Sequence, residues 1–357
     1  MRDIADRLMA WHDAGLAYAV ATVVAVSGSA PRSPGAAMAV ASDGQVVGSV
    51  SGGCVEGAVY ALCEEVLETG VAVRRSFGYS DDDAFAVGLT CGGEIEVFVS
   101  PAPDPAVLRS FDGAVATVQL LDSVGTVLAV RPDRHVGSTG FADIDRIAVD
   151  EARAMLDTGT TGIRSVRCRP GVEMFVASYA EPPRLLVFGA IDHAGALARL
   201  GTFLGYRVTV CDARPVFATR ARFPDADEVI AEWPHSYLAR TDVDARTVVC
   251  VLTHDAKFDV PLLEVALRLP VAFIGAMGSR RTHRDRLARL REVGMTETEL
   301  SRLRSPVGLD LGASTPEETA VAIAAEFVAA RRGGSGMSLT LGDGPIHHAT
   351  VPDRRQA

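Results

Sequence analysis

The chain has 357 residues, a length that predicts two or three domains of ordinary size. Hydrophobic residues make up 48% of it and charged residues 22%, proportions that exclude a disordered or fibrous protein. The net charge of −10 argues against binding to the phosphate backbone of a nucleic acid. No uninterrupted run of about 20 apolar residues is present, so no integral membrane segment is predicted.

The first residues, MRDIADRLMAWHDAG, lack the apolar centre of a signal peptide and predict an amphipathic helix. The six cysteines include no CxxC pair. They fit the reduced thiols of a cytosolic protein better than a disulfide framework, and we therefore expect a cytoplasmic location.

Four short segments near the N-terminus recur in the same order further along the chain. They start at residues 21, 48, 67 and 95 and recur after 95, 89, 89 and 77 residues, respectively. They predict two copies of a strand–strand–helix–strand unit, which together form an α+β region. Because the offsets fall along the chain, the first copy has longer loops, around 27–35 and 78–93. Long loops on a rigid scaffold commonly carry function, although these are otherwise merely longer surface loops.

Cys54 lies in a glycine-rich segment of the first copy whose counterpart in the second copy has no cysteine. It follows Gly52 and Gly53 and precedes a predicted helix over 55–67. The N-terminus of a helix favours the thiolate form of a cysteine, and thiolates bind metals or carry sulfur. We therefore predict Cys54 as a catalytic or metal-contacting thiol, and Gly52 and Gly53 as cofactor-binding residues.

Cys91 has a similar setting beside Gly92. We predict that Cys91 shares the role of Cys54 and that Gly92 binds the cofactor. The other four cysteines are predicted to be small core residues, namely Cys63, Cys168, Cys211 and Cys250. Arg32 stands in a proline-flanked loop of the first copy and is predicted to clamp an anion, the alternative being an exposed arginine on a stiff loop.

From residue 184 onward, short apolar runs alternate with segments of helical period. This alternation predicts a doubly wound parallel sheet with helices on both faces. The expected strands are 185–188, 208–211, 229–230, 248–252 and 271–274, and the expected helices are 194–204, 261–269 and 280–293. A last helix is predicted from Pro316 to about Arg332, with Thr315 as N-cap, Glu318 completing a capping box and Gly333 ending it.

The first strand of this region ends in a glycine turn of the kind that binds dinucleotides in Rossmann folds. Gly189 occupies the first position of the GxGxxG fingerprint and Ala194 the third, but Ile191 stands where the second glycine belongs. A side chain there obstructs a pyrophosphate, which argues against ordinary NAD binding. Asp212 stands where the ribose-binding carboxylate is expected, or it caps a turn at a strand end. Gly189 and Asp212 are therefore predicted cofactor-binding residues.

A second segment suited to an anion follows a later strand. Gly275 and Gly278 precede a predicted helix that begins near Ser279 and Arg280, where backbone N–H groups and arginines attract phosphate. The alternative is a tight turn followed by a basic helix face. His254 follows the preceding strand at the carboxyl edge of the sheet, where doubly wound sheets bind ligands. It is a predicted cofactor-binding residue and a candidate acid or base, the alternative being a loop histidine bonded to a carboxylate.

Together these segments resemble the XdhC/CoxI family of accessory proteins for molybdenum hydroxylases. The resemblance rests on GSAPRSPGAAM (28–38), GSVSGGCVEGAV (48–59), LTCGGEIEVF (89–98), FGAIDHAGALARL (188–200), VCDARPVFATRARFP (210–224), FIGAMGSRRTH (273–283) and GLDLGASTPEETA (308–320). It implies an N-terminal XdhC/CoxI domain over 1–102 and a Rossmann-like domain over 182–332. Residues 103–181 are then a degenerate second copy packing with the first, and residues 333–357 are a flexible or partner-docked tail.

The resemblance implies a chaperone that binds molybdenum cofactor and assists its sulfuration with a cysteine desulfurase. The chaperone then inserts the cofactor into an apo-enzyme of the xanthine dehydrogenase or carbon monoxide dehydrogenase type. The soft molybdenum dithiolene suits the thiols of Cys54 and Cys91, and the phosphate of molybdopterin suits a glycine turn, so that one ligand could bridge the two halves. We expect an accessory factor rather than a stand-alone catalyst, and a homodimer.

One turn departs from the family pattern, which often has GAGH where this chain has Gly189-Ala190-Ile191-Asp192. Asp192 is predicted to contact the cofactor, in a role that the sequence leaves open. Two other functions also stay open. One is an oxidoreductase that uses NAD(P) or FAD in the Rossmann-like domain, which Asp212 favours and Ile191 opposes. The other is a scaffold that only joins the apo-enzyme to the desulfurase.

Overall fold

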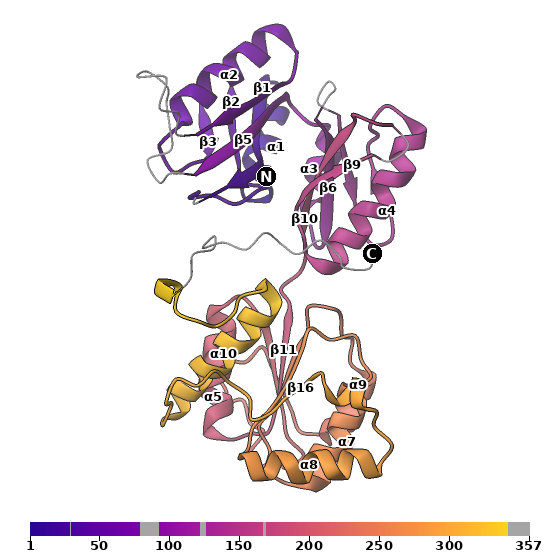
Figure 1. Ribbon diagram of the computed structural model, residues 1–357. Helices are drawn as coiled ribbons and strands as arrows, with labels where there is room; N and C mark the ends of the chain where they lie inside the picture. The colour runs from indigo at the N-terminus through magenta and orange to yellow at the C-terminus, as the bar shows by residue number, and fades with distance from the viewer. Residues whose placement is uncertain (29, 79–92, 122–125, 167–168, 342–357) are drawn as a thin grey trace. The chain divides into compact units, whose positions relative to one another are not determined.

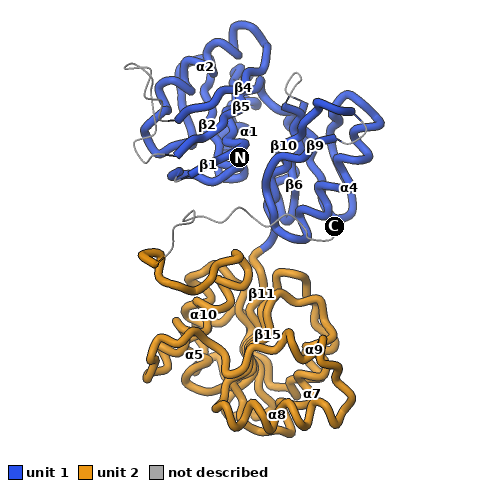
Figure 2. Tube along the Cα trace, viewed as in Figure 1, with its two compact units in different colours: residues 1–181, 344–347 blue, residues 182–343, 348–357 orange. Residues whose placement is uncertain are grey.

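The structure is a computed structural model that describes residues 1–28, 30–78, 93–121, 126–166 and 169–341. The chain divides into two compact units (Figure 2). Unit 1 comprises Met1–Glu181, and unit 2 begins at Pro182. None of the helices in the described ranges is long and apolar enough to span a membrane.

The first half of unit 1 is a five-stranded antiparallel sheet with helices on its two faces (Figure 1). Its elements are η1 (Arg2–Ile4), α1 (Ala5–Asp13), β1 (Tyr18–Ser27), β2 (Ala37–Ala41), β3 (Val46–Gly48), α2 (Glu56–Thr69), β4 (Val73–Phe77) and β5 (Glu94–Pro101). The strand order is β3-β2-β1-β5-β4. Val59 and Val66 of α2 pack on one face of the sheet, and Leu8 and Trp11 of α1 pack on the other. The helix predicted at the N-terminus is therefore confirmed, with its apolar side buried.

The second half of unit 1 repeats this topology. Its elements are α3 (Pro105–Leu108), η2 (Arg109–Phe111), β6 (Val115–Leu120), β7 (Val127–Val130), β8 (His135–Val136), α4 (Ala142–Thr158), β9 (Gly162–Ser165) and β10 (Glu173–Tyr179). The strand order β8-β7-β6-β10-β9 matches that of the first sheet element for element. The duplication is confirmed, but the repeated unit has five strands and one helix, because the sequence pattern does not reveal the short strands on either side of the helix.

Two glycines show how closely the copies correspond. Gly48 and Gly137 both have a positive φ, and a Cβ on either would collide with a carbonyl oxygen of the neighbouring strand, that of Ala37 or Val127. Each copy therefore brings its third strand against the second at a point where only glycine fits. The two copies correspond closely at this glycine, although the helix that follows begins three residues earlier in the second copy.

The two copies share a small apolar core and an ion-pair bridge. Phe98 of the first copy and Phe175 of the second belong to one buried cluster. Arg74 Nε lies 2.7 Å from Glu96 Oε1, and its Nη1 lies 2.7 Å from Glu173 Oε2, so one guanidinium joins a carboxylate of each copy. These contacts explain why the two sheets form a single unit.

Unit 2 is a six-stranded parallel sheet between two layers of helices (Figure 1). Its elements are β11 (Arg184–Phe188), α5 (Asp192–Phe203), β12 (Arg207–Cys211), β13 (Glu228–Ile230), α6 (Pro234–Arg240), β14 (Val248–Val251), α7 (Ala256–Ala266), β15 (Phe273–Ala276), α8 (Arg280–Glu292), α9 (Glu297–Leu300), β16 (Leu303–Arg304), α10 (Pro316–Arg332) and η3 (Leu339–Leu341). Helices α5 and α10 cover one face, and α6 to α9 cover the other. The predicted fold class, a Rossmann-like doubly wound sheet after an α+β region, is confirmed.

The strand order β13-β12-β11-β14-β15-β16 reverses direction between β11 and β14. Ligands of such sheets bind outside the carboxyl ends of the strands at that reversal. The segments that follow β11 and β14 contain Gly189 and His254, respectively. The backbone of the two segments is in close contact, because a Cβ on Gly189 would lie 3.0 Å from Thr253 N.

Most predicted elements of unit 2 are confirmed, with one clear error. The last helix has Thr315 as N-cap in a full capping box with Glu318, and Gly333 ends it in a left-handed conformation. By contrast, α7 begins at Ala256 rather than at Pro261, which lies inside it. A proline favours the first turn of a helix, but the N-cap here is Asp255, whose side chain accepts a hydrogen bond from Lys257 N. The short elements α6, α9 and β16 were not predicted.

We predict that Phe327→Ala lowers the free energy of unfolding of unit 2 by about 3–5 kcal/mol. Phe327 is fully buried on α10, and its ring contacts those of Tyr206 and Phe273 at centroid distances of 5.3 and 6.2 Å. The measurement is urea unfolding followed by the fluorescence of Trp233 in a Trp11→Phe background. The neighbouring Val328 is 38% exposed, and Val328→Ala should change stability by less than about 0.5 kcal/mol. Equal losses in both variants would contradict the packing of α10 on the sheet.

Candidate functional site

Residues 49–55 connect β3 to α2 in unit 1 and are called the Cys54 turn below. The carboxylate of Glu56, the first residue of α2, accepts five hydrogen bonds from it. The donors are Ser49 Oγ (2.7 Å), Ser51 N (2.9 Å), Gly52 N (2.9 Å), Gly53 N (2.8 Å) and the Ser51 hydroxyl. One side chain therefore fixes nearly the whole turn, and Glu56 was not among the residues predicted from the sequence.

The two glycines of the Cys54 turn are required by backbone conformation. Gly52 has φ +78° and Gly53 has φ +122°, backbone angles that residues with a side chain rarely adopt. A Cβ at either position would have no atom within 4 Å, so the constraint is conformational rather than steric. Their N–H groups point to Glu56 rather than to a ligand. The prediction that Gly52 and Gly53 bind a cofactor is not tested, but their contacts assign them to shaping the turn.

Cys54 is half-buried at the end of this turn and packs in part against the core of the first sheet. It lies immediately before Val55, the N-cap residue of α2, as predicted. The thiol is thus held on a turn that has a fixed shape and retains access to solvent. Partial exposure is one property of thiols that contact metals or carry sulfur.

Hydrogen bonds to Glu56 also change its acidity. Burial alone acts to raise the pKa of Glu56, but the hydroxyls of Ser51 and Ser49 and the backbone N–H of Ser51 outweigh it and lower the pKa to about 2. The carboxylate is therefore charged at any physiological pH and accepts all of its hydrogen bonds.

The second copy of unit 1 also has a carboxylate at the position of Glu56, but it has no cysteine at the position of Cys54. Asp145, at the position of Glu56, accepts hydrogen bonds from Ser138 Oγ (2.7 Å) and Thr139 N (2.6 Å). The counterpart of Cys54 is Asp143, which lies in the first turn of α4 and pairs with Arg169 at 3.0 Å. Relative to the repeat, α4 begins three residues earlier than α2. The first copy therefore replaces a helical turn by a non-helical one, and only there is a cysteine presented.

The other predicted residues of unit 1 lie elsewhere in the fold or outside the described part of the chain. Arg32 is exposed in the segment before β2, where its charge acts on the amino group of Met1. Cys91 and Gly92 lie outside the described residues, and so does Cys168. Cys63 is buried in α2, as predicted, and its burial raises the pKa of the thiol to about 12.

In unit 2, the turn after β11 is bound to Asp212 at the end of β12. Asp212 Oδ2 accepts a hydrogen bond from Ala190 N (2.8 Å), and the carboxylate also pairs with Arg214 through Nε (2.9 Å) and Nη2 (2.8 Å). Burial acts to raise the pKa of Asp212, but the bonds from Arg214 and Ala190 hold it below its ordinary value. The predicted ribose-binding carboxylate is thus buried and fully engaged within the chain.

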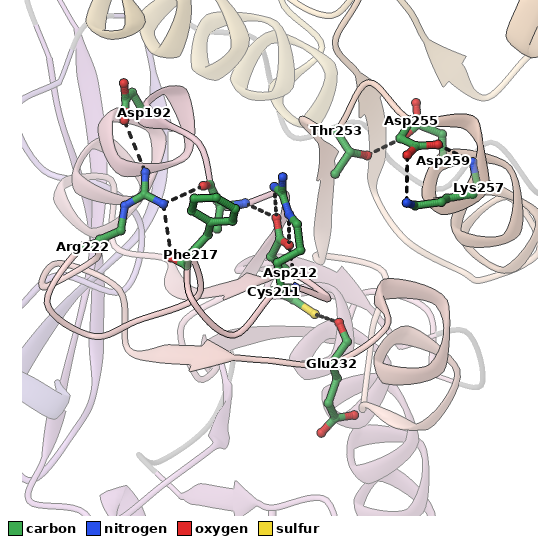
Figure 3. Close-up of polar contacts among 12 residues, drawn as sticks. Asp192, Cys211, Asp212, Phe217, Arg222, Glu232, Thr253, Asp255, Lys257 and Asp259 are labelled. Carbon is green, nitrogen blue, oxygen red and sulfur yellow. Dashed lines mark hydrogen bonds and ion pairs between the residues drawn. The ribbon is translucent and has the colours of Figure 1, made fainter.

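Asp192, whose role the sequence left open, lies at the start of α5 and is highly exposed. Its carboxylate lies 3.5 Å from Arg222 Nη2. Figure 3 shows Arg222 extended toward Asp192, with Phe217 beside it. Asp192, Arg214, Phe217 and Arg222 line a shallow hollow together with the turn after β11.

A second hollow lies between α7 and α8. His254 is exposed at its edge, and Asp259, Thr282 and Arg286 are among its lining residues. Arg286 and Asp259 form a buried ion pair at 2.8 Å. Thr253 also donates a hydrogen bond to Asp259 (Figure 3). The hollow has both acidic and basic side chains, and its Arg286 is already paired with Asp259 inside the fold.

Structural roles account for Gly275, Gly278 and Ser279, three of the four residues predicted around the start of α8. Gly275 lies inside β15, where a Cβ would collide with the side chain of Val307, so packing requires a glycine at this position. Ser279 is the N-cap of α8 and accepts a hydrogen bond from Thr282 N (3.1 Å). Gly278 has φ +144° just before it, and Arg280 is exposed. Their predicted contacts with a cofactor remain predictions.

Cys211 and Cys250 lie in β12 and β14 and are buried, as predicted. Burial raises the pKa of the Cys211 thiol to about 12 and also raises the pKa of the Cys250 thiol. Within the residues that the structure describes, no three or more His, Cys, Asp and Glu side chains are grouped so as to hold a metal ion. The half-buried thiol of Cys54 is therefore the soft donor that the described part of the chain offers.

Comparison with protein families gives two matches, one in each unit. The model described as the XdhC and CoxI family matches residues 11–78, which include the Cys54 turn, and the model described as the XdhC Rossmann domain matches residues 185–327. The chain belongs to the XdhC/CoxI family. The predicted resemblance is thereby confirmed on both halves of the molecule.

Known relatives match this XdhC/CoxI protein over most of its length. The chain is 27% identical to a protein of Bacillus subtilis (strain 168) named as a probable subunit of xanthine dehydrogenase, over 88% of this chain and 93% of that protein. It is 28% identical to the molybdenum cofactor insertion chaperone PaoD of Escherichia coli (strain K12), over 89% of this chain and 84% of that protein. A solved structure described as a xanthine dehydrogenase from Bacillus halodurans matches with a TM-score of 0.63 and 25% identity, covering 94% of this chain and 98% of that chain.

We predict that Glu56→Gln in this XdhC/CoxI protein makes Cys54 react severalfold faster with iodoacetamide, because the amide holds the turn less tightly and opens it more often. The rate is measured by mass spectrometry in a background with Cys91 and Cys168 replaced by Ser. Asp145→Asn, the equivalent change in the second copy, is the matched control and should leave the rate unchanged. The same acceleration in both variants would show that Glu56 does not act locally on the turn.

The lowered pKa of Glu56 predicts a pH dependence of stability. Because the pKa in the folded state is about 2 and the ordinary value is 4.5, the stabilisation is complete above pH 4.5 and is lost as the pH falls from there toward 2. Thermal unfolding across that range should show this loss in the wild type and a smaller one in Glu56→Gln, which has no carboxylate to protonate at this site. Parallel curves for the two proteins would refute the assignment.

Proposed function

We propose that this protein is a molybdenum cofactor insertion chaperone that serves an enzyme of the xanthine dehydrogenase type. The observation that carries the proposal is the half-buried thiol of Cys54, held on a turn whose shape Glu56 fixes. A cysteine thiolate is a ligand suited to soft metal–sulfur centres such as a molybdenum dithiolene. In this proposal Cys54 contacts the metal end of the cofactor while it is carried.

The names of the relatives support the same function. The relative in Escherichia coli is named a molybdenum cofactor insertion chaperone, and the one in Bacillus subtilis is named a probable subunit of xanthine dehydrogenase. The molybdenum cofactor is cargo here rather than a resident group. A chaperone must release its cargo, and a single thiol at the protein surface is a weaker and more reversible anchor than a closed metal cage.

Comparison of the two copies distinguishes the residues that maintain the fold from the residue proposed to contact the cargo. The second copy keeps the serine and carboxylate contacts at Ser138 and Asp145 but has Asp143 in place of Cys54. An acidic side chain paired with arginine offers no soft donor. We therefore assign cargo contact to the first copy and a structural role to the second.

The proposal has finer parts. It includes help in replacing an oxo ligand of the cofactor by sulfur, with a cysteine desulfurase as the source. It includes an apo-enzyme of either the xanthine dehydrogenase or the carbon monoxide dehydrogenase type as recipient. It also includes participation of Cys91 and formation of a homodimer, both of which stay predictions.

We predict that Cys54→Ser lowers both the amount of molybdenum cofactor retained by the purified protein and the activity it restores to an apo-molybdoenzyme, each by about tenfold or more. Oxygen in place of sulfur preserves size but removes the soft donor. Retained cofactor is measured by the fluorescence of the oxidised pterin, and insertion by the activity of the recipient.

Asp143→Ala, which changes the equivalent position of the second copy, is the control and should retain both properties. A Cys54→Ser protein that binds and delivers cofactor as well as the wild type would exclude the thiol from this function. A protein that binds both the apo-enzyme and the desulfurase but retains no cofactor would favour the scaffold alternative.

A further inference from the structure

The glycine turn of unit 2 is closed to the kind of ligand that such turns usually bind. Gly189 N donates to Cys211 O (2.9 Å), Ala190 N to Asp212 Oδ2 (2.8 Å) and Ile191 N to Gly189 O (3.1 Å). In a dinucleotide-binding fold, N–H groups of this turn and of the helix that follows receive the pyrophosphate. Here a pyrophosphate would have to displace acceptors that the chain itself supplies.

The ribose position is closed in the same way. Asp212 is 2% exposed, and its two oxygens accept hydrogen bonds from Ala190 N and from three nitrogens of Arg214. A ribose hydroxyl would therefore compete with a bidentate ion pair whose carboxylate is buried, which is a strong interaction. The N–H groups of the turn itself and the carboxylate at the ribose position are thus engaged within unit 2.

Beside this closed turn, unit 2 presents two guanidinium groups around one aromatic ring. Phe217 is 40% exposed, and the guanidinium carbons of Arg214 and Arg222 lie 4.5 and 5.5 Å from its ring centroid. Such cation–π contacts restrict where a guanidinium can move. The ring therefore holds two positive groups near each other, against their mutual repulsion.

Each arginine is also anchored at one side and free to bind at another. Arg214 is held by Asp212 but its side chain remains 47% exposed. Arg222 Nη1 donates to Ala190 O (3.2 Å) and to Phe217 O (3.4 Å), and its side chain is 36% exposed. The negative charge of Asp192, 3.5 Å from Arg222, sits on a side chain that is 86% exposed, so it can move aside for an anion.

We propose that Arg214, Phe217 and Arg222 form a side-chain site for a phosphate ester. The arginines donate to the phosphate oxygens, and Phe217 is a positioning residue. Resting on the proposed function, the natural ligand is the phosphate end of the molybdenum cofactor. The hollow that these residues line beside Ala190 and Ile191 is where the phosphate lies. The site therefore selects a phosphate through side chains rather than through the backbone of a glycine turn.

The test is titration of the full-length protein with inorganic phosphate, pyrophosphate and NAD by isothermal calorimetry. Pyrophosphate should bind, and Arg222→Met should weaken it about tenfold or more, as expected for loss of charge-assisted hydrogen bonds. Arg199→Met is the matched control. Arg199 is an arginine of α5 whose side chain is 68% exposed and which does not line the hollow, so its loss should leave binding unchanged.

Phe217 is tested by its effect on arginine placement. Phe217→Leu should weaken pyrophosphate binding severalfold, and Phe217→Tyr, which keeps an aromatic face, should restore it. Equal binding in Phe217→Leu and wild type would overturn the positioning role. Loss of binding in Arg199→Met as large as in Arg222→Met would show a general effect of surface charge and overturn the site.

Measuring how much molybdenum cofactor each variant retains tests the phosphate site separately from the proposed role of Cys54. Weaker retention of molybdenum cofactor by Arg222→Met, matched by competition from added pyrophosphate, supports the assignment of the phosphate end of the cargo. Loss of pyrophosphate binding with cofactor retention unchanged would overturn that assignment while leaving the role of Cys54 intact. NAD binding tighter than that of pyrophosphate would show that the turn opens to a dinucleotide and would overturn the proposal.

Discussion

The carboxylate of Glu56 fixes the position of Cys54 through hydrogen bonds to the residues that precede it. Three backbone N–H groups and two hydroxyls converge on two oxygens, and these bonds leave the turn little freedom. The chain needs glycine at positions 52 and 53 because the path that satisfies these bonds passes through positive φ. A thiol on a flexible loop would lose more entropy on binding a ligand than one already held in place.

The duplication shows which parts of this arrangement belong to the fold. In both copies a carboxylate at the start of the helix bonds a serine that follows the third strand, Glu56 with Ser49 and Asp145 with Ser138. In the second copy the helix begins earlier, and Asp143, the residue that corresponds to Cys54, lies in its first turn. The carboxylate contact thus serves a general purpose in joining the strand to the helix. The first copy uses the same contact to hold a non-helical turn that carries a thiol.

Unit 2 has the fold of a dinucleotide-binding domain, but the groups of its glycine turn that usually bind the ligand are bonded within the chain. The sheet, its reversal between β11 and β14 and the position of Asp212 all follow the pattern of a dinucleotide-binding domain. The hydrogen bonds do not, because Asp212 binds Arg214 and the N–H of Ala190. The exposed positive groups belong to Arg214 and Arg222, which follow Asp212 in the chain. Charge at the ligand-binding edge is therefore supplied by side chains in this family member.

The recurrence of short segments predicted the duplicated α+β region. Periodicity, glycine spacing and capping residues predicted the parallel sheet, the capped last helix and the place of Cys54 before α2, because these signals act over a few neighbouring positions. These signals did not reveal α6, α9 or the short strands, because an element of a few residues is too short to show a periodic pattern. The start of α7 was predicted at Pro261 instead of Ala256, because proline is favourable as the first helical residue and Asp255 was not recognised as the N-cap. Three contacts emerge only from the folded chain, namely those of Glu56 with the Cys54 turn, of Asp212 with Arg214, and of Phe217 with two arginines. They depend on the path of the backbone, and a directional hydrogen bond or ring contact forms only where that path brings its two groups within about 3–6 Å of each other.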